Sequence, residues 1–400
     1  MFTVTMADVI RKGYLERLRS GKDRTDTIKI VTGMRRCGKT TLMKQYIRAL
    51  KDSGVDEKDI ISFNFESKDT MSITDNNILL QEIDKLYRGK RVYVFLDEVQ
   101  RVKEWEKAVN SLQVDYDADI YITGSNGHIL SSELSTYLSG RYAEIQMLPL
   151  SFAEFLELHP GNKDERFMQY IRSGSLPVID PDADETFERD HLIGIYNTVL
   201  MKDVLTHSGA VNAAVLNDVA RFLFSNIGNI TSCSKIADIL KEDNRKIRKY
   251  LDALQEAYLI YKAERYDIRG KKLLDTLEKY YVSDTGMRNA VLGISSREDN
   301  SRQIENIVYL ELIRRGYEVA VGKYGDLEVD FTARRGNVIE YYQVTMSMLS
   351  QDVYERETRS LKLIRDNYVK TVLSLDGFLI DLPDGMRHEN IISWLLDRKQ

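Results

Sequence analysis

The chain has 400 residues, of which 43% are hydrophobic and 30% are charged, and its formal net charge at pH 7 is −5. This length exceeds one typical hydrophobic core, so we expect roughly two to four domains. The acidic total excludes a globally basic nucleic-acid binder, although not a local basic patch. Two cysteines and five histidines exclude a disulfide framework and predict no metal site built from these residue types. No apolar run reaches membrane-spanning length, which favours a cytoplasmic protein without a membrane partner.

A glycine-rich loop follows the first predicted strand. Residues 33–40 match G-x-x-x-x-G-K-[ST], the phosphate-binding loop of nucleoside triphosphatases. Residues 27–32 alternate like a strand and residues 41–49 have helical spacing, so strand, loop and helix come in the required order; a glycine turn with a surface lysine is the alternative. The expected nucleotide-binding residues are Gly33, Met34, Arg35, Arg36, Cys37, Gly38, Lys39, Thr40 and Thr41. Lys39 is expected on the phosphates and Thr40 on Mg²⁺.

The second half of such a site follows the apolar strand predicted at residues 91–96. Asp97 is expected to hold Mg²⁺ opposite Thr40, and Glu98 to act as the general base that polarises the attacking water. A solvated turn is the ordinary alternative for an Asp-Glu pair. The phosphate loop on a neighbouring strand argues against that alternative.

Two further polar positions complete the predicted catalytic set with Lys39 and Glu98. Asn126 follows the buried strand 120–123 and is the first candidate for a residue that contacts the γ-phosphate and positions the water, with Ser125 second and a plain turn as the alternative. Arg141 is a candidate arginine finger, acting within the subunit or on a neighbouring copy. A surface arginine with a structural partner is the other interpretation of Arg141.

Several segments together resemble one known family. They are residues 32–40, 96–100, 123–126, 138–141 and 149–155. The combination resembles a bacterial and archaeal family of AAA-type ATPases that join the ATPase to a C-terminal domain of unknown function. The resemblance implies ATP as the nucleotide, Mg²⁺ as its metal and an α/β fold. The implied domains are a P-loop AAA-type core at 1–150, a helical lid at 151–210, a winged helix at 211–295 and a restriction-endonuclease-like α/β domain at 296–400.

The middle of the chain has a helix-turn-helix pattern, at residues 217–257, followed by a predicted two-stranded wing at 262–282. Basic residues are concentrated on the would-be recognition helix and the wing: Arg245, Lys246, Arg248, Lys249, Arg269, Lys271 and Lys272. Such a patch suits the backbone of double-stranded DNA. The alternative is a protein partner, with the basic residues forming a solvated surface.

The C-terminal part predicts a helix at residues 306–315 and then three strands, an order that resembles the PD-(D/E)XK nuclease core. Glu305, at the start of the helix, and Asp330 match the first two acidic positions of active members. The third motif, Glu-x-Lys in those members, is here Gln343-Val344-Thr345, and threonine supplies no positive charge. The resemblance therefore implies a degenerate site of Glu305, Asp330 and Gln343 whose cleavage is impaired or absent.

The sequence thus predicts an enzyme that binds and hydrolyses ATP with Mg²⁺. Its nucleotide state is expected to control the winged-helix and nuclease-like parts, on DNA or a protein partner, and in a homo-oligomer. One alternative is an ATP-regulated DNA nuclease. Another is a non-hydrolysing, nucleotide-gated scaffold.

Overall fold

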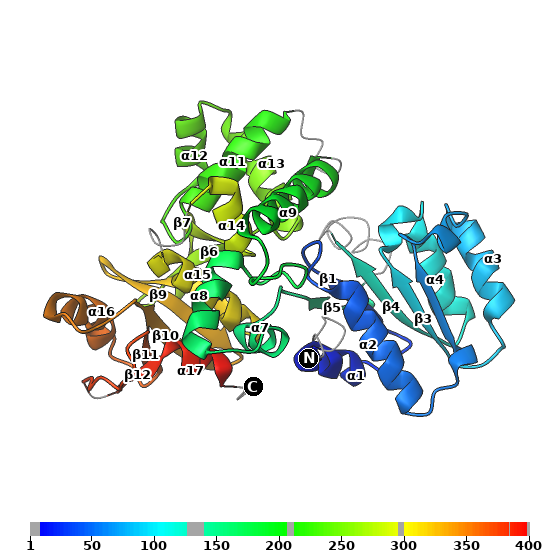
Figure 1. Ribbon diagram of the computed structural model, residues 1–400, viewed down its shortest axis with the longest axis horizontal. Coiled ribbons are helices and arrows are strands. Elements are labelled where there is room, and N and C mark those ends of the chain that lie inside the picture. Colours follow the sequence, from blue (N-terminus) through cyan, green and yellow to red (C-terminus); the bar gives the residue numbers. More distant parts are fainter. Residues whose placement is uncertain (1–8, 126–139, 206–211, 295–299, 384, 398–400) are drawn as a thin grey trace. The chain divides into compact units, whose positions relative to one another are not determined.

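The structure is a computed structural model that describes residues 9–125, 140–205, 212–294, 300–383 and 385–397 (Figure 1). Its elements fall into two units, one of Met1–Pro149 with Glu256–Tyr258 and one of Leu150–Gln255 with Leu259–Gln400. None of the helices in the described ranges is long and apolar enough to cross a membrane.

Five parallel strands form the sheet of the first unit, in the order β2-β3-β4-β1-β5. They are β1 (Ile28–Thr32), β2 (Ile60–Asn64), β3 (Val92–Asp97), β4 (Ala118–Gly124) and β5 (Tyr142–Gln146). Every residue of β1, β3 and β4 is buried, which explains their continuous apolar runs, because parallel strands are usually covered on both faces. The carboxyl ends of these strands meet at one edge of the sheet, where ligands of α/β proteins bind.

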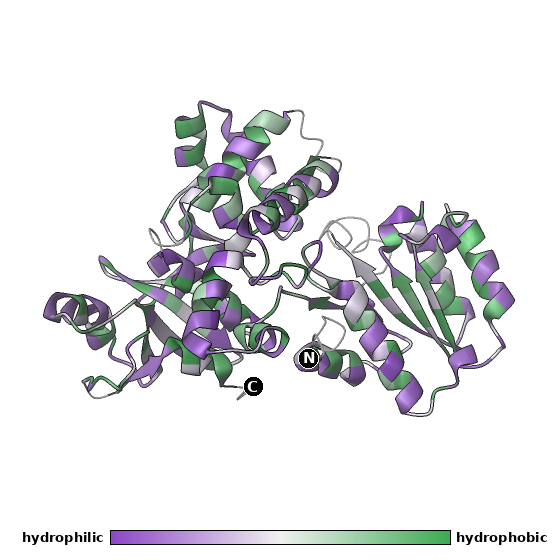
Figure 2. Cartoon of the chain, viewed as in Figure 1, coloured by the Kyte–Doolittle hydropathy of each residue, from purple (hydrophilic) through white to green (hydrophobic). Residues whose placement is uncertain are grey.

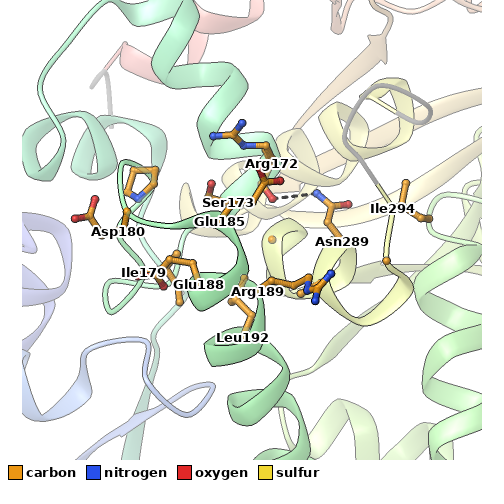
Figure 3. Close-up of a pocket in the computed structure, with 15 residues that line it drawn as sticks. Arg172, Ser173, Ile179, Asp180, Glu185, Glu188, Arg189, Leu192, Asn289 and Ile294 are labelled. Carbon is orange, nitrogen blue, oxygen red and sulfur yellow. Dashed lines mark hydrogen bonds between the residues drawn. The ribbon is translucent and has the colours of Figure 1, made fainter.

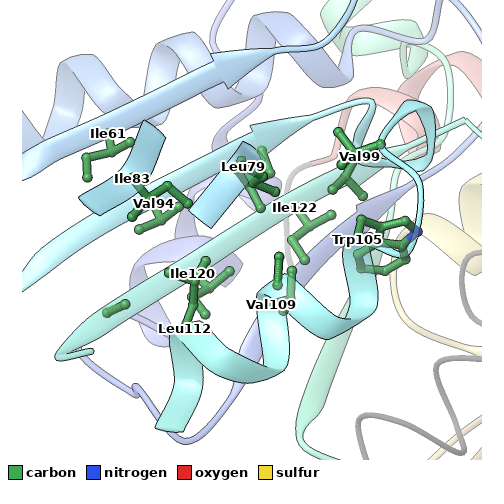
Figure 4. Close-up of a cluster of buried hydrophobic side chains, with 14 of the residues drawn as sticks. Ile61, Leu79, Ile83, Val94, Val99, Trp105, Val109, Leu112, Ile120 and Ile122 are labelled. Carbon is green, nitrogen blue, oxygen red and sulfur yellow. The ribbon is translucent and has the colours of Figure 1, made fainter. Parts of the chain in front are cut away.

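Helices cover both faces of this sheet, and Figure 2 shows hydrophilic and hydrophobic residues alternating around them. They are α1 (Lys12–Ser20), α2 (Lys39–Asp52), α3 (Asn76–Leu86) and α4 (Trp105–Asp115), with 3₁₀ turns at Glu57–Asp59, Lys68–Thr70 and Val99–Arg101. On one face, Leu79 of α3 and Leu112 of α4 join the cluster around Ile120 (Figure 4). On the other, the ring of Tyr46 in α2 lies 5.1 Å from that of Tyr121. Each buried side chain of this kind contributes about 1.5–3 kcal/mol, so both helix layers hold the sheet firmly.

The helices of the second unit lie before, between and after its strands in sequence. They are α7 (Phe152–Leu158), α8 (Lys163–Ser173), α9 (Glu185–Thr198) with the π-helical segment Val199–Leu205, α11 (Ala213–Ser225), α12 (Cys233–Leu240), α13 (Asn244–Glu256), α14 (Thr285–Leu292), α15 (Asn300–Arg314), α16 (Gln351–Leu363) and α17 (Ile391–Leu396). Side-chain caps set several starts, such as the capping box of Ser151 with Glu154 before α7 and the cap of Ser232 on α12. The bounds of α11, α12 and α13 are close to those predicted for the helices of the helix-turn-helix pattern.

Seven strands form a mixed sheet in this unit, in the order β12-β11-β10-β9-β8-β6-β7. They are β6 (Ile260–Asp267), β7 (Lys272–Val282), β8 (Glu318–Tyr324), β9 (Leu327–Arg335), β10 (Val338–Val344), β11 (Val369–Ser374) and β12 (Met386–Asn390). The hairpin β6–β7 was expected as a wing, but β6 also pairs in parallel with β8, with Arg265 opposite Val321. One sheet therefore crosses the boundary predicted at residue 295. The sequence could not indicate this, because pairing between strands that are far apart in sequence leaves no local pattern.

The two faces of this sheet pack against different helices. Leu361 of α16 joins the buried cluster that contains Tyr341 of β10. The next residue, Tyr342, faces the opposite way, and its ring centroid lies 5.9 Å from that of Trp394 in α17. The sheet is therefore the middle layer of the second unit.

A bulge interrupts the pairing of β8 with β9. Ala320 pairs with Thr332 and Gly322 with Val329, so three steps along β9 match two along β8. A glycine suits this position, because a Cβ atom at Gly322 would lie 2.9 Å from the Cβ atom of Val329. Bulges re-aim side chains, and Asp330 lies inside this one.

Candidate functional site

The glycine-rich loop joins β1 to α2 at the carboxyl edge of the parallel sheet. Gly33 and Gly38 have φ values of 140° and 104°, which residues with side chains rarely adopt. A Cβ atom at Gly33 would also lie 2.2 Å from the carbonyl oxygen of Met147, so only glycine fits there. Gly38 is the N-cap of α2 and has no side chain, so the positive end of the helix opens onto the loop.

Lys39 is buried beside this loop. Its Nζ donates hydrogen bonds of 2.9 and 3.2 Å to the carbonyl oxygens of Gly33 and Met34, and it lies 3.8 Å from Oε1 of Glu98. Two of these partners are neutral carbonyls, and a phosphate would be a stronger partner for an ammonium group. The loop and the lysine therefore fit a nucleotide phosphate.

The other residues of the predicted loop differ in exposure. Met34 and Cys37 are buried, and burial raises the pKa of the Cys37 thiol. Arg36 is exposed with a φ of 69°, whereas Arg35 lies 3.8 Å from Glu66. Thr41 is half-buried in the first turn of α2. The buried members of the loop therefore shape its backbone, and the two arginines lie nearer solvent.

Sequence reasoning missed Arg11, whose side chain bonds to the backbone of the phosphate loop and of the segment after β5. Its guanidinium is fully buried and donates hydrogen bonds to the carbonyl oxygens of Cys37 at 3.3 Å, Leu148 at 2.9 Å and Pro149 at 3.3 Å. Its partners lie 26 and more than 130 residues away in sequence, so no local pattern could reveal them.

The two residues predicted to hold Mg²⁺ lie close together. The hydroxyl of Thr123, at the end of β4, donates a hydrogen bond to Asp97. Burial raises the pKa of Asp97, and the hydroxyls of Thr123 and Thr40 partly oppose that rise, which shows that Thr40 lies near this carboxylate. A carboxylate and a hydroxyl at one point beside the phosphate loop are the oxygen ligands that Mg²⁺ favours.

Glu98 follows Asp97 in a left-handed conformation with a φ of 57°, which is uncommon outside glycine. Its backbone N–H donates to the hydroxyl of Thr123 at 2.9 Å. Its Oε2 accepts hydrogen bonds from Gln100 at 2.6 Å and from Ser125 at 3.2 Å. Backbone and side-chain bonds therefore hold the carboxylate on the phosphate-loop side of the strand ends.

The remaining two predicted catalytic residues are Asn126 and Arg141. Asn126 lies outside the described residues, whereas Ser125, the second candidate, is buried against Glu98. Arg141 is exposed, and its carbonyl accepts the N–H of Ile28 at the start of β1. Arg141 thus lies level with Ile28. At about 3.3 Å per strand residue, this position is roughly 16 Å from Gly33 along β1, at the edge formed by the amino ends of the strands. The direction of β5 therefore places Arg141 at the amino edge of the sheet, and its role as an arginine finger, within the subunit or on a neighbouring copy, stays a prediction.

Comparisons with known proteins identify the family of this chain. The profile of an AAA domain matches residues 25–156, and that of a domain of unknown function (DUF8612) matches residues 164–298. An uncharacterised protein of Haemophilus influenzae is 37% identical over 407 residues, covering 98% of this chain and 100% of the relative. The chain belongs to this family of AAA-domain proteins. An uncharacterised protein of Methanocaldococcus jannaschii is 30% identical over 393 residues, covering 90% of this chain and 85% of that protein.

A solved structure shows the same fold for the family. The Walker-type ATPase of Pyrococcus abyssi aligns with a TM-score of 0.50 at 14% identity, over 73% of this chain and 98% of that one. The first unit thus has the α/β core of a P-loop, AAA-type ATPase, with a nucleotide-binding loop.

The basic residues predicted to contact DNA in this family member are mostly exposed: Arg245, Arg248 and Lys249 on α13, and Arg269, Lys271 and Lys272 at the β6–β7 turn. Two of the seven have structural partners. Lys246 lies 2.8 Å from Glu242, and the guanidinium of Arg269 lies 4.3 Å from the ring centre of Tyr324 in β8. These two residues stabilise the second unit, so they are weaker candidates for nucleic-acid contacts.

The three predicted residues of the degenerate nuclease site line one cavity of about 770 Å³. Glu305 lies in the second turn of α15, which starts at Asn300, and not at its first residue as expected. Asp330 accepts the N–H of Val344 at 2.9 Å, while Oε1 of Gln343 accepts the N–H of Asp330 at 3.3 Å. The β9 bulge and the end of β10 are thus joined by side chains at this cavity.

Sequence reasoning missed a lysine at this centre. Nζ of Lys279 in β7 lies 3.0 Å from Oε1 of Glu305 and 2.8 Å from Oε1 of Glu328. Burial lowers the pKa of Lys279, but the carboxylates of Glu305, Asp330 and Glu328 outweigh burial and raise it overall. Burial, followed by the charge of Glu305, raises the pKa of Asp330 well above its usual range.

The second unit also has a polar cavity away from the predicted site residues. This cavity of about 570 Å³ lies among α8, α9 and α14 (Figure 3). In it, Asn289 donates to the carbonyl oxygens of Ile171 and Arg172 and to Gln303, which makes it a junction between helices.

His159, Asp180 and Asp182 could together hold a metal ion, contrary to the expectation that histidines form no such cluster. Their separation of about twenty residues hid the cluster in the sequence. Nη1 of Arg166 already donates to both oxygens of Asp182, at 2.7 and 2.8 Å, so this carboxylate is charge-compensated.

Proposed function

We propose that the first unit binds ATP with Mg²⁺ and hydrolyses it. The observation that carries this proposal is the position of Lys39, whose Nζ bonds to the glycine loop and lies 3.8 Å from Oε1 of Glu98, next to Asp97 and Thr40. It places a hydroxyl, two carboxylates and an ammonium group, all of the types that phosphoryl transfer needs, at the end of one glycine loop.

The proposed roles follow from the contacts. Lys39 exchanges its carbonyl partners for the phosphate oxygens, and the N–H groups of the loop and of α2 hold the same phosphates. Thr40 and Asp97 are the residues that would hold Mg²⁺, which when bound neutralises phosphate charge. Glu98 accepts the proton of the attacking water, and Gln100 and Ser125 orient the Glu98 carboxylate. Asn126 remains the candidate contact to the γ-phosphate.

The first test is steady-state ATP hydrolysis by wild type and Glu98→Gln. We expect nucleotide binding to persist in the variant and turnover to fall by about a hundredfold or more, in the range of a lost general base. Glu104→Gln is a matched control, because Glu104 has a similar φ of 55° but is exposed at the start of α4. Normal hydrolysis by Glu98→Gln would remove Glu98 from its role.

We further propose that Arg141 contacts the nucleotide of a neighbouring copy in a homo-oligomer. Its exposure supports this, since the residue lies away from its own loop. Mixing Arg141→Ala with Glu98→Gln subunits should then restore part of the turnover that each variant lacks alone. No complementation at any ratio contradicts the proposal.

The nucleotide state is proposed to control the winged-helix and nuclease-like parts. We propose that the exposed arginines and lysines of α13 and the β6–β7 turn contact the backbone of double-stranded DNA. Stimulation of ATP hydrolysis by DNA, lost in an Arg245→Ala, Arg248→Ala, Lys249→Ala variant, supports this. Turnover indifferent to DNA favours a protein partner.

The alternative of an ATP-regulated DNA nuclease is supported by the convergence of Glu305, Asp330 and Gln343 on one cavity. It requires metal-dependent cleavage that disappears in Asp330→Ala. Intact DNA with every divalent metal excludes it. The scaffold alternative requires saturable ATP binding with negligible turnover, with or without DNA.

A further inference from the structure

One side chain near the end of β4 contacts both acidic residues of the candidate ATPase site. In the sheet, β4 lies between β3, which leads to Asp97 and Glu98, and β1, which leads to the phosphate loop. Thr123 of β4 is paired with Val31 of β1, while the regular pairing of β3 with β4 ends one residue before Thr123. The backbone of Thr123 is therefore fixed between the two halves of the site.

The hydroxyl of the fully buried Thr123 makes two hydrogen bonds that differ in direction. It accepts the backbone N–H of Glu98 at 2.9 Å, and it donates its own proton to Oδ1 of Asp97. These directions follow from the chemistry of the partners, because an N–H group only donates and an ionised carboxylate only accepts. The bond to Asp97 keeps the hydroxyl from turning away, so its lone pair stays directed at the N–H of Glu98.

Glu98 depends on this contact because its backbone is in a left-handed conformation. Its φ of 57° is costly for a residue with a side chain, and such conformations persist only where neighbouring contacts hold them. Glu104 has a similar φ of 55° but is exposed, whereas Glu98 is only 8% exposed. In a buried residue, an N–H group without a partner costs free energy. Loss of the Thr123 hydroxyl would therefore release the backbone that aims the Glu98 side chain.

We propose that Thr123 is a positioning residue for ATP hydrolysis, which sets the direction of the Glu98 carboxylate relative to the phosphate loop. Thr123 acts through Glu98 and does not contact the nucleotide. This role differs from the one expected of Asn126, which is a contact to the γ-phosphate. The inference rests on the proposed function of the first unit and deepens it, since it says how the general base is held.

The test uses full-length protein in which Thr123→Val removes the hydroxyl at nearly unchanged shape and Thr123→Ser keeps it. Thr70→Val is the matched control, because Thr70 is a buried threonine of the same unit whose hydroxyl donates to the carbonyl oxygens of Asn64 and Ser67, at 2.6 and 3.0 Å. Steady-state hydrolysis gives kcat and KM for each variant. Amide hydrogen exchange of residues 97–100 in nucleotide-free, metal-free protein is a second readout, which needs no activity.

We expect Thr123→Val to lower kcat by about tenfold to a hundredfold at a nearly unchanged KM, as for a displaced catalytic group. Thr123→Ser should keep most of the turnover, and Thr70→Val should keep all of it. The amide of Glu98 should exchange about fivefold faster in Thr123→Val, the equivalent of one lost hydrogen bond. If Thr123→Val does not fold, Thr123→Ala carries the same measurements.

A double variant shows whether Thr123 acts through Glu98. Adding Thr123→Val to Glu98→Gln should cause no further loss of turnover, because the base that Thr123 aims is already gone. Multiplied losses, an unchanged exchange of the Glu98 amide, or a kcat of Thr123→Val within twofold of wild type overturns the inference and leaves the ATPase proposal intact. Absence of turnover in wild type, or normal turnover in Glu98→Gln, instead refutes the proposed function or its base, and the inference with it.

Discussion

Among the described residues, each unit has a carboxylate centre with a buried lysine, Lys39 in the first and Lys279 in the second, and these two lysines are held differently. Lys39 in the first unit bonds to two neutral carbonyls and lies 3.8 Å from Glu98. Lys279 in the second unit contacts two carboxylates at 3.0 and 2.8 Å. A lysine on carbonyls is available to an anionic ligand, whereas a lysine on carboxylates compensates charge. The difference in partners therefore predicts that Lys39 can bind a phosphate, whereas Lys279 holds its carboxylates in place.

The stability of the two lysine variants should differ most. Lys279→Met leaves the half-buried carboxylates of Glu305 and Glu328 without their cation, and we expect a loss of about 3 kcal/mol, the low end of the range for a buried pair. Lys39→Met leaves only carbonyls without a donor, and we expect a loss of about 1 kcal/mol. Hydrogen exchange of amides in α15 and in α2 measures each unit separately. Equal losses for the two variants would contradict the comparison.

Of the two buried lysines in this comparison, only Lys39 should affect nucleotide binding. Lys39→Ala should weaken ATP binding by about tenfold to a hundredfold, the equivalent of a charge-assisted hydrogen bond of about 1.5–3 kcal/mol. Lys44→Ala, which removes an exposed lysine of the same helix α2, is the control and should bind normally. Fluorescent-nucleotide titration measures both, and an undiminished affinity of Lys39→Ala contradicts the assignment of the loop.

The bulge in β9 should matter for the second centre. Gly322→Ala brings a Cβ atom within 2.9 Å of the Cβ atom of Val329, and we expect a loss of about 1–3 kcal/mol, as in overpacked cores. Urea unfolding measures this loss. Gly377→Ala has open space around its Cβ position and serves as the control. Unchanged stability of Gly322→Ala would show that the bulge does not need a glycine.

The smallest expected effect is a pH dependence in the second unit. Burial lowers the pKa of His388, whose ring bonds to Ser374 and accepts the N–H of Ile380. The unfolded chain therefore takes up a proton near pH 6.5 that the folded chain does not, so stability falls as pH drops below that value. In His388→Gln, this decline between pH 7.5 and 5.5 should shrink, while His191→Gln in α9 should keep it. Urea unfolding at both pH values measures it, and an equally steep decline in His388→Gln contradicts it.

The first centre could be predicted because its parts are local. The loop and Thr40 are contiguous, and Asp97 ends a recognisable strand, so motif and strand order place them together. Arg141 shows the limit of that reasoning. Its residue type suggested a finger, but the direction of β5 puts it at the far edge of the sheet, which the parallel order of strands could have indicated.

The second centre could be predicted only in part. Glu305, Asp330 and Gln343 follow a known order of elements, and the structure brings them to one cavity. Lys279 could not be found, because its contact depends on the parallel pairing of β6 with β8, which follows from tertiary packing. The bulge at Asp330 likewise arises between two strands, and neither strand's own residues signal it.

The shared sheet has a consequence for how this protein can be divided or recombined. A fragment beginning at residue 296 would lose β6 and β7, leaving β8 as a bare edge with unpaired N–H and C=O groups that invite aggregation. It would also leave Glu305 without Lys279 and Tyr281. We therefore expect an exchange of C-terminal parts between relatives to need a junction upstream of Ile260, so that the hairpin stays with the strands that follow it.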